Sequence, residues 1–74
     1  MARLPVLSGR DLIRALEKSG YLVDRQKGSH IILRQIVEPF RRVTVPDHKE
    51  LAKGTLRSIL RHTGLTADEL LRLL

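Results

Sequence analysis

Apolar residues recur at helical spacing near the start of the chain, three and four positions apart. This stripe consists of Leu12, Ile13, Ala15 and Leu16. Ser8 precedes the stripe, and Asp11 follows three positions later, which is the pattern of a capping box at a helix start. Gly20 is a residue type at which helices end. The pattern therefore predicts a helix between Ser8 and Gly20.

Short runs rich in β-branched and aliphatic residues predict three strands in the middle of the chain. The predicted strands are 21–26, 29–36 and 41–45. Lys27 and Gly28 form the turn between the first two strands, and residues 37–40 make a looser second connection. Pro46 is expected to end the third strand because proline donates no ladder hydrogen bond.

Side chains alternate between the two faces of a strand, so the register decides which residues share a surface. We expect one face to pack on the helices, namely that of Ile31, Leu33, Val43 and Val45. The opposite face then presents His30, Ile32, Arg34, Arg42 and Thr44. A shift by one residue would instead turn His30 inward.

Two helices are predicted in the last third of the chain, after a polar connector at 47–52. The first runs from Thr55 to about Thr63, with Gly64 as its cap, and its core side carries Leu56, Ile59 and Leu60. A capping box at Thr66 to Glu69 starts the second, which carries Leu70, Leu71, Leu73 and Leu74. Four leucines exceed what a thin core holds, so this helix either closes the core, which we favour, or contacts another chain.

These elements predict an α+β fold, a two-layer α-β-β-β-α sandwich with a short C-terminal helix. The 74 residues allow one domain, 1–74, and a composition of 42% hydrophobic and 30% charged residues is ordinary for a globular protein. The net charge of +6 points to a polyanion or an acidic protein as partner, with solubility alone as the alternative.

Cations recur four positions apart on both long helices. We interpret Arg10, Arg14 and Lys18 as a solvated helix face, whereas Lys53, Arg57 and Arg61 are suited to a phosphate backbone. The chain has no cysteine, so disulfides and thiolate zinc sites are excluded. Neither a signal peptide nor an apolar stretch of membrane-spanning length is present, and we expect a cytoplasmic protein with no membrane contact.

Most catalytic motifs are absent from the sequence. His30, His48 and His62 lack the spacing of a zinc site, so we expect no metal. Gly28 precedes a strand rather than a helix, so it is no nucleotide-binding loop, and we expect no cofactor. Ser29 adjoins His30, but neighbours on a strand point to opposite faces, which excludes a nucleophile pair.

What remains is a histidine among lysines and arginines. This set suits the attack of an RNA ribose 2′-hydroxyl on its own neighbouring phosphate, because the substrate supplies the nucleophile. Histidine exchanges a proton near neutral pH, and cations stabilise the charge that grows on phosphorus. From the residues alone, a surface or RNA-contacting role without chemistry for His30 stays open. Tyr21 is the only aromatic residue expected near the sheet, so base stacking is poorly supported.

Four sequence blocks in order resemble the HicA (YcfA-like) toxin family over about residues 4–70. They lie at residues 8–12, 25–30, 43–46 and 53–60. The resemblance implies a fold similar to the double-stranded RNA-binding domain and an mRNA interferase of a toxin–antitoxin pair. It implies that His30 is catalytic, that mRNA is the substrate and that a HicB-type antitoxin binds the toxin and covers the histidine. It also implies structural roles for Gly28, with positive φ, and for Gly54 at a helix start.

The leading hypothesis is therefore a metal-independent endoribonuclease in which His30 is catalytic. The expected RNA contacts are Lys27, Gly28, Ser29, Arg34 and Arg42. Ile31 departs from the family pattern, in which a second histidine or a polar residue often stands there, and residues 36–40 replace a usual Asp-Gly turn. A non-catalytic module that binds double-stranded RNA is the first alternative. An interaction protein that docks through its leucine-rich C-terminus is the second.

Overall fold

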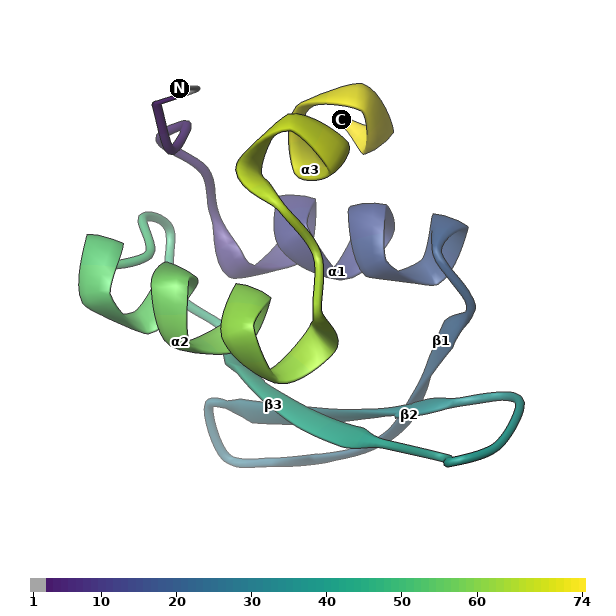
Figure 1. Ribbon diagram of the computed structural model, residues 1–74. Helices are drawn as coiled ribbons and strands as arrows, with labels where there is room; N and C mark the ends of the chain where they lie inside the picture. The colour runs from purple at the N-terminus through teal and green to yellow at the C-terminus, as the bar shows by residue number, and fades with distance from the viewer. Residues whose placement is uncertain (1–2) are drawn as a thin grey trace.

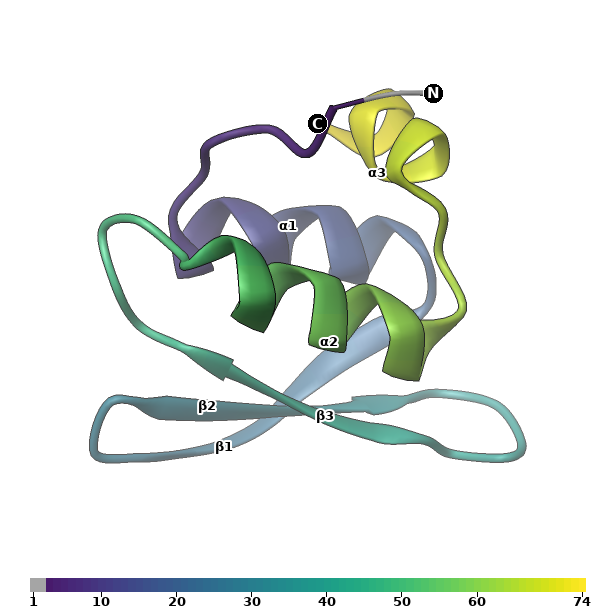
Figure 2. The same ribbon diagram turned by 60° about the vertical axis from the view of Figure 1, so that its left-hand side comes forward.

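The computed structural model describes residues 3–74. The elements in chain order are α1 (Gly9–Lys18), β1 (Tyr21–Lys27), β2 (His30–Gln35), β3 (Arg42–Pro46), α2 (Lys53–Thr63) and α3 (Ala67–Leu73). The three strands form an antiparallel sheet in the order β1-β2-β3. Helices α1 and α2 cover one face of the sheet, and α3 lies over α1 on the side away from the sheet (Figures 1 and 2). The predicted α+β sandwich is confirmed.

Helix α1 begins where its sequence signals predict. The Ser8 hydroxyl accepts a hydrogen bond from the Asp11 amide at 3.0 Å, and the Ser8 amide donates to the Asp11 carboxylate at 3.4 Å. The predicted capping box is therefore present. Gly9 follows the cap, and a β-carbon there would lie 2.0 Å from the carbonyl oxygen of Pro46. The first turn of α1 thus rests directly on the end of β3.

The pairing of β2 with β3 follows the predicted register. Ile31 pairs with Val45, and Leu33 pairs with Val43. All four side chains are buried against α1 and α2, whereas His30 and Arg34 on the other face are exposed. The face of the sheet turned away from the helices is called the outer face below.

Strand β1 contains a bulge that the sequence pattern did not predict. Val23 pairs with Leu33, but Arg25 pairs with Ile32, so Asp24 is an extra residue. A bulge of one residue exchanges the faces of all positions that follow it. Strict alternation from buried Tyr21 would turn Arg25 and Lys27 toward the core. The bulge turns both side chains to the outer face instead.

The turn between β1 and β2 lies one residue later than predicted. Lys27 pairs with His30 as the last residue of β1, and Gly28 and Ser29 form the two-residue loop. Gly28 has a φ of 61°, which fits the first central position of a type II′ hairpin turn. The Gln26 side-chain amide donates to the Gly28 carbonyl at 3.0 Å. The positive φ expected for Gly28 is confirmed.

The connection at 47–52 is less polar than predicted because Leu51 is buried in the core. Its backbone also ties the layers together: the Gly9 amide donates to the His48 carbonyl at 2.9 Å, and the Asp47 amide donates to the Ser29 carbonyl at 2.6 Å. Helix α2 begins at Lys53, two residues earlier than predicted.

Gly54 lies in the first turn of α2, and a β-carbon there would meet nothing within 4 Å. Its φ is not positive, so its conformation does not require glycine. Gly64, by contrast, ends α2 in the left-handed conformation with a φ of 76°, as predicted.

Helix α3 closes the core with part of its leucine cluster. Leu70 is fully buried, and Leu73 packs partly against the core. The Lys18 ammonium group donates to the Leu73 carbonyl at 2.9 Å, which fixes the end of α3 on α1. Leu71 and Leu74 stay about half exposed. Core closure, the favoured interpretation, is thus correct for two of the four leucines.

Candidate functional site

His30 is the first residue of β2 and lies exposed on the outer face, beside the hairpin turn. Lys27 of β1 stands directly opposite on one side, and Pro46 of β3 stands opposite on the other. The next residue, Ile31, is buried and anchors the strand to the core. The imidazole is therefore presented to solvent from the start of the central strand.

Two cations lie close to His30. Residues directly opposite in an antiparallel pair have β-carbons about 5 Å apart, and diagonal neighbours lie roughly 7–8 Å apart. Lys27 occupies the opposite position, and Arg25, which pairs with Ile32, occupies the diagonal one. Arg25 was missed at the sequence level. The signal that could have found it is the conflict between strict alternation in β1 and the cost of turning an arginine toward the core.

Arg34 and Arg42 lie on the same face but do not surround His30. They pair directly with each other. Arg34 stands four residues along β2 from His30, a distance of roughly 13 Å at the usual strand rise. The Asp24 carboxylate at the bulge lies 3.8 Å from the Arg34 guanidinium group. The outer face therefore carries two separate basic groups, one at each end.

Backbone hydrogen bonds and an ion pair fix the turn that precedes His30. The Ser29 carbonyl accepts from the Asp47 amide, and the Asp47 carboxylate accepts two hydrogen bonds from Arg10, at 3.1 and 3.0 Å. The hydrogen bonds from Arg10 hold the pKa of Asp47 below its ordinary value, and the carboxylate raises the pKa of Arg10. Asp47 is thus a charged carboxylate held near the hairpin turn.

The aromatic residues are placed differently from the sequence-based expectation. Tyr21 is buried in the core, and its hydroxyl has no hydrogen-bond partner among the described residues. Burial raises the pKa of that hydroxyl. Phe40, by contrast, lies half exposed at the end of the sheet opposite His30. Tyr21 therefore offers no stacking surface, and Phe40 lies nearer the sheet surface than the sequence suggested.

The three histidines do not converge. His48 lies exposed in the connection before α2, and the ring of His62 on α2 contacts the Ser58 carbonyl at 3.1 Å. Within residues 3–74, no three His, Cys, Asp or Glu side chains are arranged to hold a metal ion.

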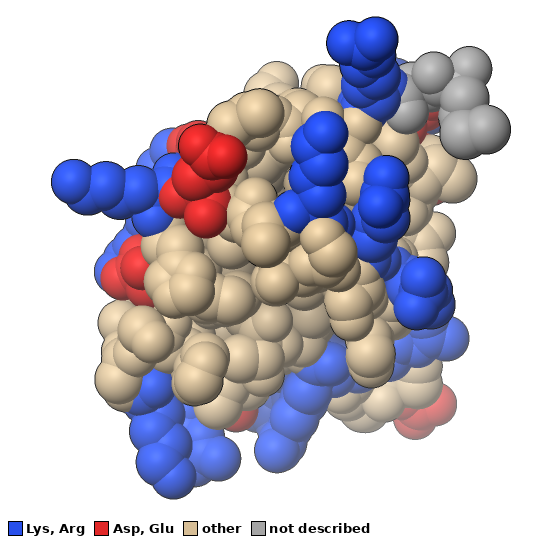
Figure 3. All heavy atoms as spheres, turned by 90° about the vertical axis from the view of Figure 1, so that its left-hand side faces the viewer, with Lys and Arg blue, Asp and Glu red and all other residues tan. Residues whose placement is uncertain are grey.

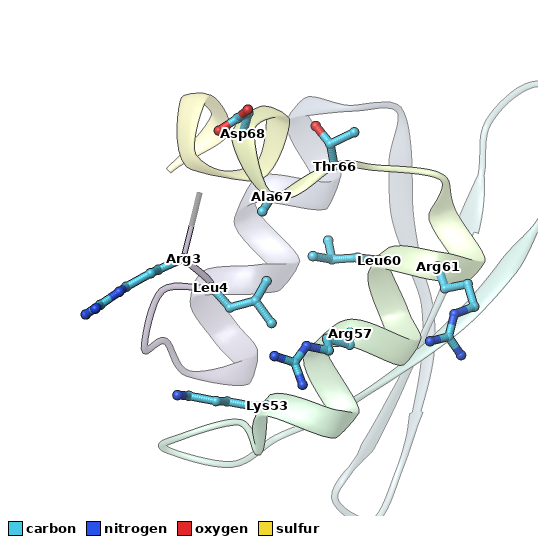
Figure 4. A pocket seen from close by; sticks show the side chains of 9 residues that line it. All are labelled: Arg3, Leu4, Lys53, Arg57, Leu60, Arg61, Thr66, Ala67 and Asp68. Atoms are coloured by element: carbon cyan, nitrogen blue, oxygen red, sulfur yellow. The ribbon is translucent and has the colours of Figure 1, made fainter. Parts of the chain in front are cut away.

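A second basic region flanks a groove of about 740 Å³ between the N-terminal segment, α2 and the start of α3 (Figure 4). Leu4, Leu60 and Ala67 line its floor, and Arg3, Lys53 and Arg57 project around its rim. Viewed from the side, Lys and Arg gather over this region and again at the lower, sheet side of the molecule (Figure 3).

The two helical rows of cations differ in their partners. On α1, Arg10 binds Asp47, Arg14 binds Asp11 and Lys18 binds a backbone carbonyl. On α2, no ion pair to Lys53, Arg57 or Arg61 exists among the described residues. Two of the three cations in the α1 row are therefore paired with carboxylates, whereas none in the α2 row is paired among the described residues.

Comparison with known families identifies the chain. The sequence model described as "HicA toxin of bacterial toxin-antitoxin" matches residues 9–65, from the first residue of α1 to just past the end of α2. The chain belongs to the HicA toxin family. The match spans the whole sheet, including the hairpin that carries His30, and ends before α3. No curated protein matches the chain closely enough to be counted a relative.

Membership of the HicA family gives the chain the role of the toxin in a toxin–antitoxin system. It also agrees with the fold, since three strands between two helices are consistent with the sandwich expected of this family. Within residues 3–74, none of the helices has the length and apolar character that crossing a membrane requires.

Proposed function

We propose that this HicA-family toxin is an mRNA interferase: a metal-independent endoribonuclease, contained in one domain at 1–74, that cleaves mRNA with His30. The observation that carries the proposal is the exposed His30 imidazole beside Lys27 and Arg25 on the outer face, in a chain of this toxin family. No cofactor is needed for the chemistry described next.

The proposed reaction is an intramolecular transesterification of RNA. The ribose 2′-oxygen forms a bond to the adjacent phosphorus while the bond from phosphorus to the 5′-oxygen of the next nucleotide breaks. The 2′-hydroxyl loses a proton, and the leaving 5′-oxygen gains one. His30 carries out one of these proton transfers, and Lys27 and Arg25 stabilise the negative charge on the phosphoryl oxygens. The products are a 2′,3′-cyclic phosphate and a free 5′-hydroxyl.

The remaining proposed RNA contacts have different roles according to their distance from His30. Gly28 and Ser29 form the turn directly before His30, so a phosphate at the reacting position passes close to their backbone. Arg34 and Arg42 lie at the far end of the outer face, where they would hold a phosphate of a neighbouring nucleotide. The proposed substrate of the free toxin is mRNA, and the proposed inhibitor is a HicB-type antitoxin.

The first prediction concerns His30. His30→Ala is expected to lower the rate of RNA cleavage by roughly 10²- to 10⁴-fold, the usual contribution of a positioned acid or base. Its thermal unfolding should match that of wild type because the side chain is exposed. The measurement is cleavage of a fluorescent RNA oligonucleotide by purified protein in the presence of EDTA.

His62→Ala is the matched control, since it removes an exposed histidine from α2 without touching the sheet. An RNA with a single 2′-deoxy residue at the cleaved position should stay intact. Equal cleavage by wild type and His30→Ala would reject the catalytic assignment. Salt-sensitive binding of RNA that is never cut would instead support the non-catalytic RNA-binding module.

A further inference from the structure

Exposed apolar side chains gather at the end of the sheet farthest from His30. Within residues 3–74, five of the eight large apolar side chains that stay exposed lie in β1 or in the segment after β2. They are Leu22, Val23, Ile36, Val37 and Phe40, with exposed fractions of 55%, 45%, 57%, 62% and 50%, and they are called the β2–β3 patch here. Single exposed apolar residues are ordinary, but a group of them marks an interaction surface.

The β2–β3 patch is continuous across elements. Leu22, Val23, Ile36 and Phe40 line one groove of about 440 Å³. The Ile36 amide donates to the Gly20 carbonyl at 3.0 Å, which holds the loop after β2 against the start of β1. The Phe40 amide donates to the Val37 carbonyl at 2.8 Å, so the loop folds back on itself. These bonds keep the apolar side chains together.

The composition of the patch favours a protein over RNA. Four of its five side chains are aliphatic, and aliphatic groups neither pair with bases nor offer a flat surface for stacking. Phe40 is the one aromatic side chain in the patch. Burial of aliphatic and aromatic side chains at the centre of a contact is typical of interfaces between proteins.

Charge around the patch defines the partner further. Arg34 and Asp24 line the groove of the patch. Arg42 pairs with Arg34 across the strands, and Glu38 and Arg41 adjoin patch residues along the chain. The Asp24 carboxylate lies 3.8 Å from the Arg34 guanidinium group. The Arg41 guanidinium group donates to the His62 carbonyl at 3.5 Å and forms no ion pair among the described residues. With a net charge of +6, a second copy of the chain would be repelled. An acidic partner would be attracted.

We propose that the β2–β3 patch is the docking surface for a protein partner that presents apolar side chains flanked by carboxylates. In this toxin–antitoxin system the partner is the antitoxin, so the inference rests on the proposed pairing but not on the chemistry of His30. Arg34 and Leu22 of this region belong to the outer face, so a bound partner also covers surface proposed to contact RNA.

The experiment measures binding of the purified cognate antitoxin to immobilised toxin variants. Ile36→Thr combined with Phe40→Asn removes apolar surface from the patch, and asparagine tolerates the positive φ of 56° at position 40. Val6→Thr combined with Leu71→Gln is the matched control, since both residues are exposed and lie outside the patch. Val37→Thr is a milder patch variant. Thermal unfolding of each variant checks that it is folded.

The Kd for the antitoxin is expected to rise by about tenfold or more in the patch variant, and by less than about threefold in the control variant. RNA cleavage by each free variant is measured separately, so a loss of antitoxin binding is interpreted independently of whether His30 is catalytic. Equal losses in the patch and control variants, or unchanged binding by folded patch variants, would overturn the proposal. It would also be overturned if the patch variant kept antitoxin binding and only dissolved a dimer of the free toxin.

Discussion

At the scale of single residues, distance from His30 separates the cations of the outer face into two groups. Lys27 and Arg25 neighbour His30 across the strand pair, whereas Arg34 and Arg42 stand roughly 13 Å away. Charge stabilisation in a transition state falls with distance, and exposed charges are screened by salt beyond about 10 Å. The near pair is therefore suited to the reacting phosphate and the far pair to binding a neighbouring one.

Substitutions in the near pair are expected to affect mainly the cleavage rate, and substitutions in the far pair mainly the affinity for RNA. Arg25→Gln or Lys27→Gln should lower kcat by roughly ten- to a hundredfold, because each removes a charge near the reacting phosphate. Arg42→Gln should mainly raise KM and reduce the salt dependence of RNA binding, with little change in kcat. Cleavage kinetics at several salt concentrations measure both effects. A larger loss of kcat in Arg42→Gln than in Lys27→Gln would contradict this division.

At the scale of elements, the contact of α1 with β3 depends on a glycine. The β-carbon of any other residue at position 9 would overlap the Pro46 carbonyl, and backbone cannot move aside as a side chain can. The same segment supports the hairpin end, because Asp47 follows Pro46 and binds both Ser29 and Arg10. Helix packing and the placement of His30 are thus coupled through one short stretch of chain.

Gly9→Ala is expected to lower the free energy of unfolding by about 1–3 kcal/mol, the usual cost of forcing extra volume into a tight contact. For a domain of this size, each kcal/mol corresponds to a Tm change of about 4–8 °C. Gly54→Ala is the matched control in α2, where a β-carbon has open space, and it should raise stability by up to about 1 kcal/mol. Thermal unfolding followed by circular dichroism measures both. Equal Tm values for the two variants would disprove the close contact.

At the scale of the whole molecule, a few carboxylates tie the layers and helix ends of a strongly basic chain. Hydrogen bonds from the two capping boxes lower the pKa of Asp11 and of Glu69, and the hydrogen bonds from Arg10 lower the pKa of Asp47. A carboxyl whose pKa is lower in the folded state stabilises the fold while it is ionised. That stability is complete above the unfolded pKa of about 4 and is lost as the pH falls through the lower folded value.

Thermal stability is therefore expected to be flat near neutral pH and to fall below about pH 4, where net positive charge also rises. Asp47→Asn should lower Tm at pH 7 and make the acid decline shallower, because it removes one of the contributing groups. Glu38→Gln in the exposed loop is the control and should leave the profile unchanged. The measurement is Tm between pH 2 and pH 7. An identical acid decline in wild type and Asp47→Asn would contradict the role of the Arg10 pair.

Most of the fold follows from local signals in the sequence. The capping boxes at Ser8 and Thr66 and the left-handed cap at Gly64 each depend on hydrogen bonds or φ angles within a few residues. The alternation in β2 also determines which face His30 occupies, because the opposite set is strongly apolar. These features need no knowledge of the rest of the molecule, and the sequence alone determined them.

Tertiary structure decided what surrounds His30. The bulge at Asp24 arises from pairing between β1 and β2, and it alone turns Arg25 and Lys27 toward the histidine. Tertiary pairing likewise placed Arg34 against Arg42 and away from His30, and it gathered the exposed apolar residues of β1 and the loop after β2. Such arrangements depend on register between segments distant in the chain, which no local pattern of residues specifies.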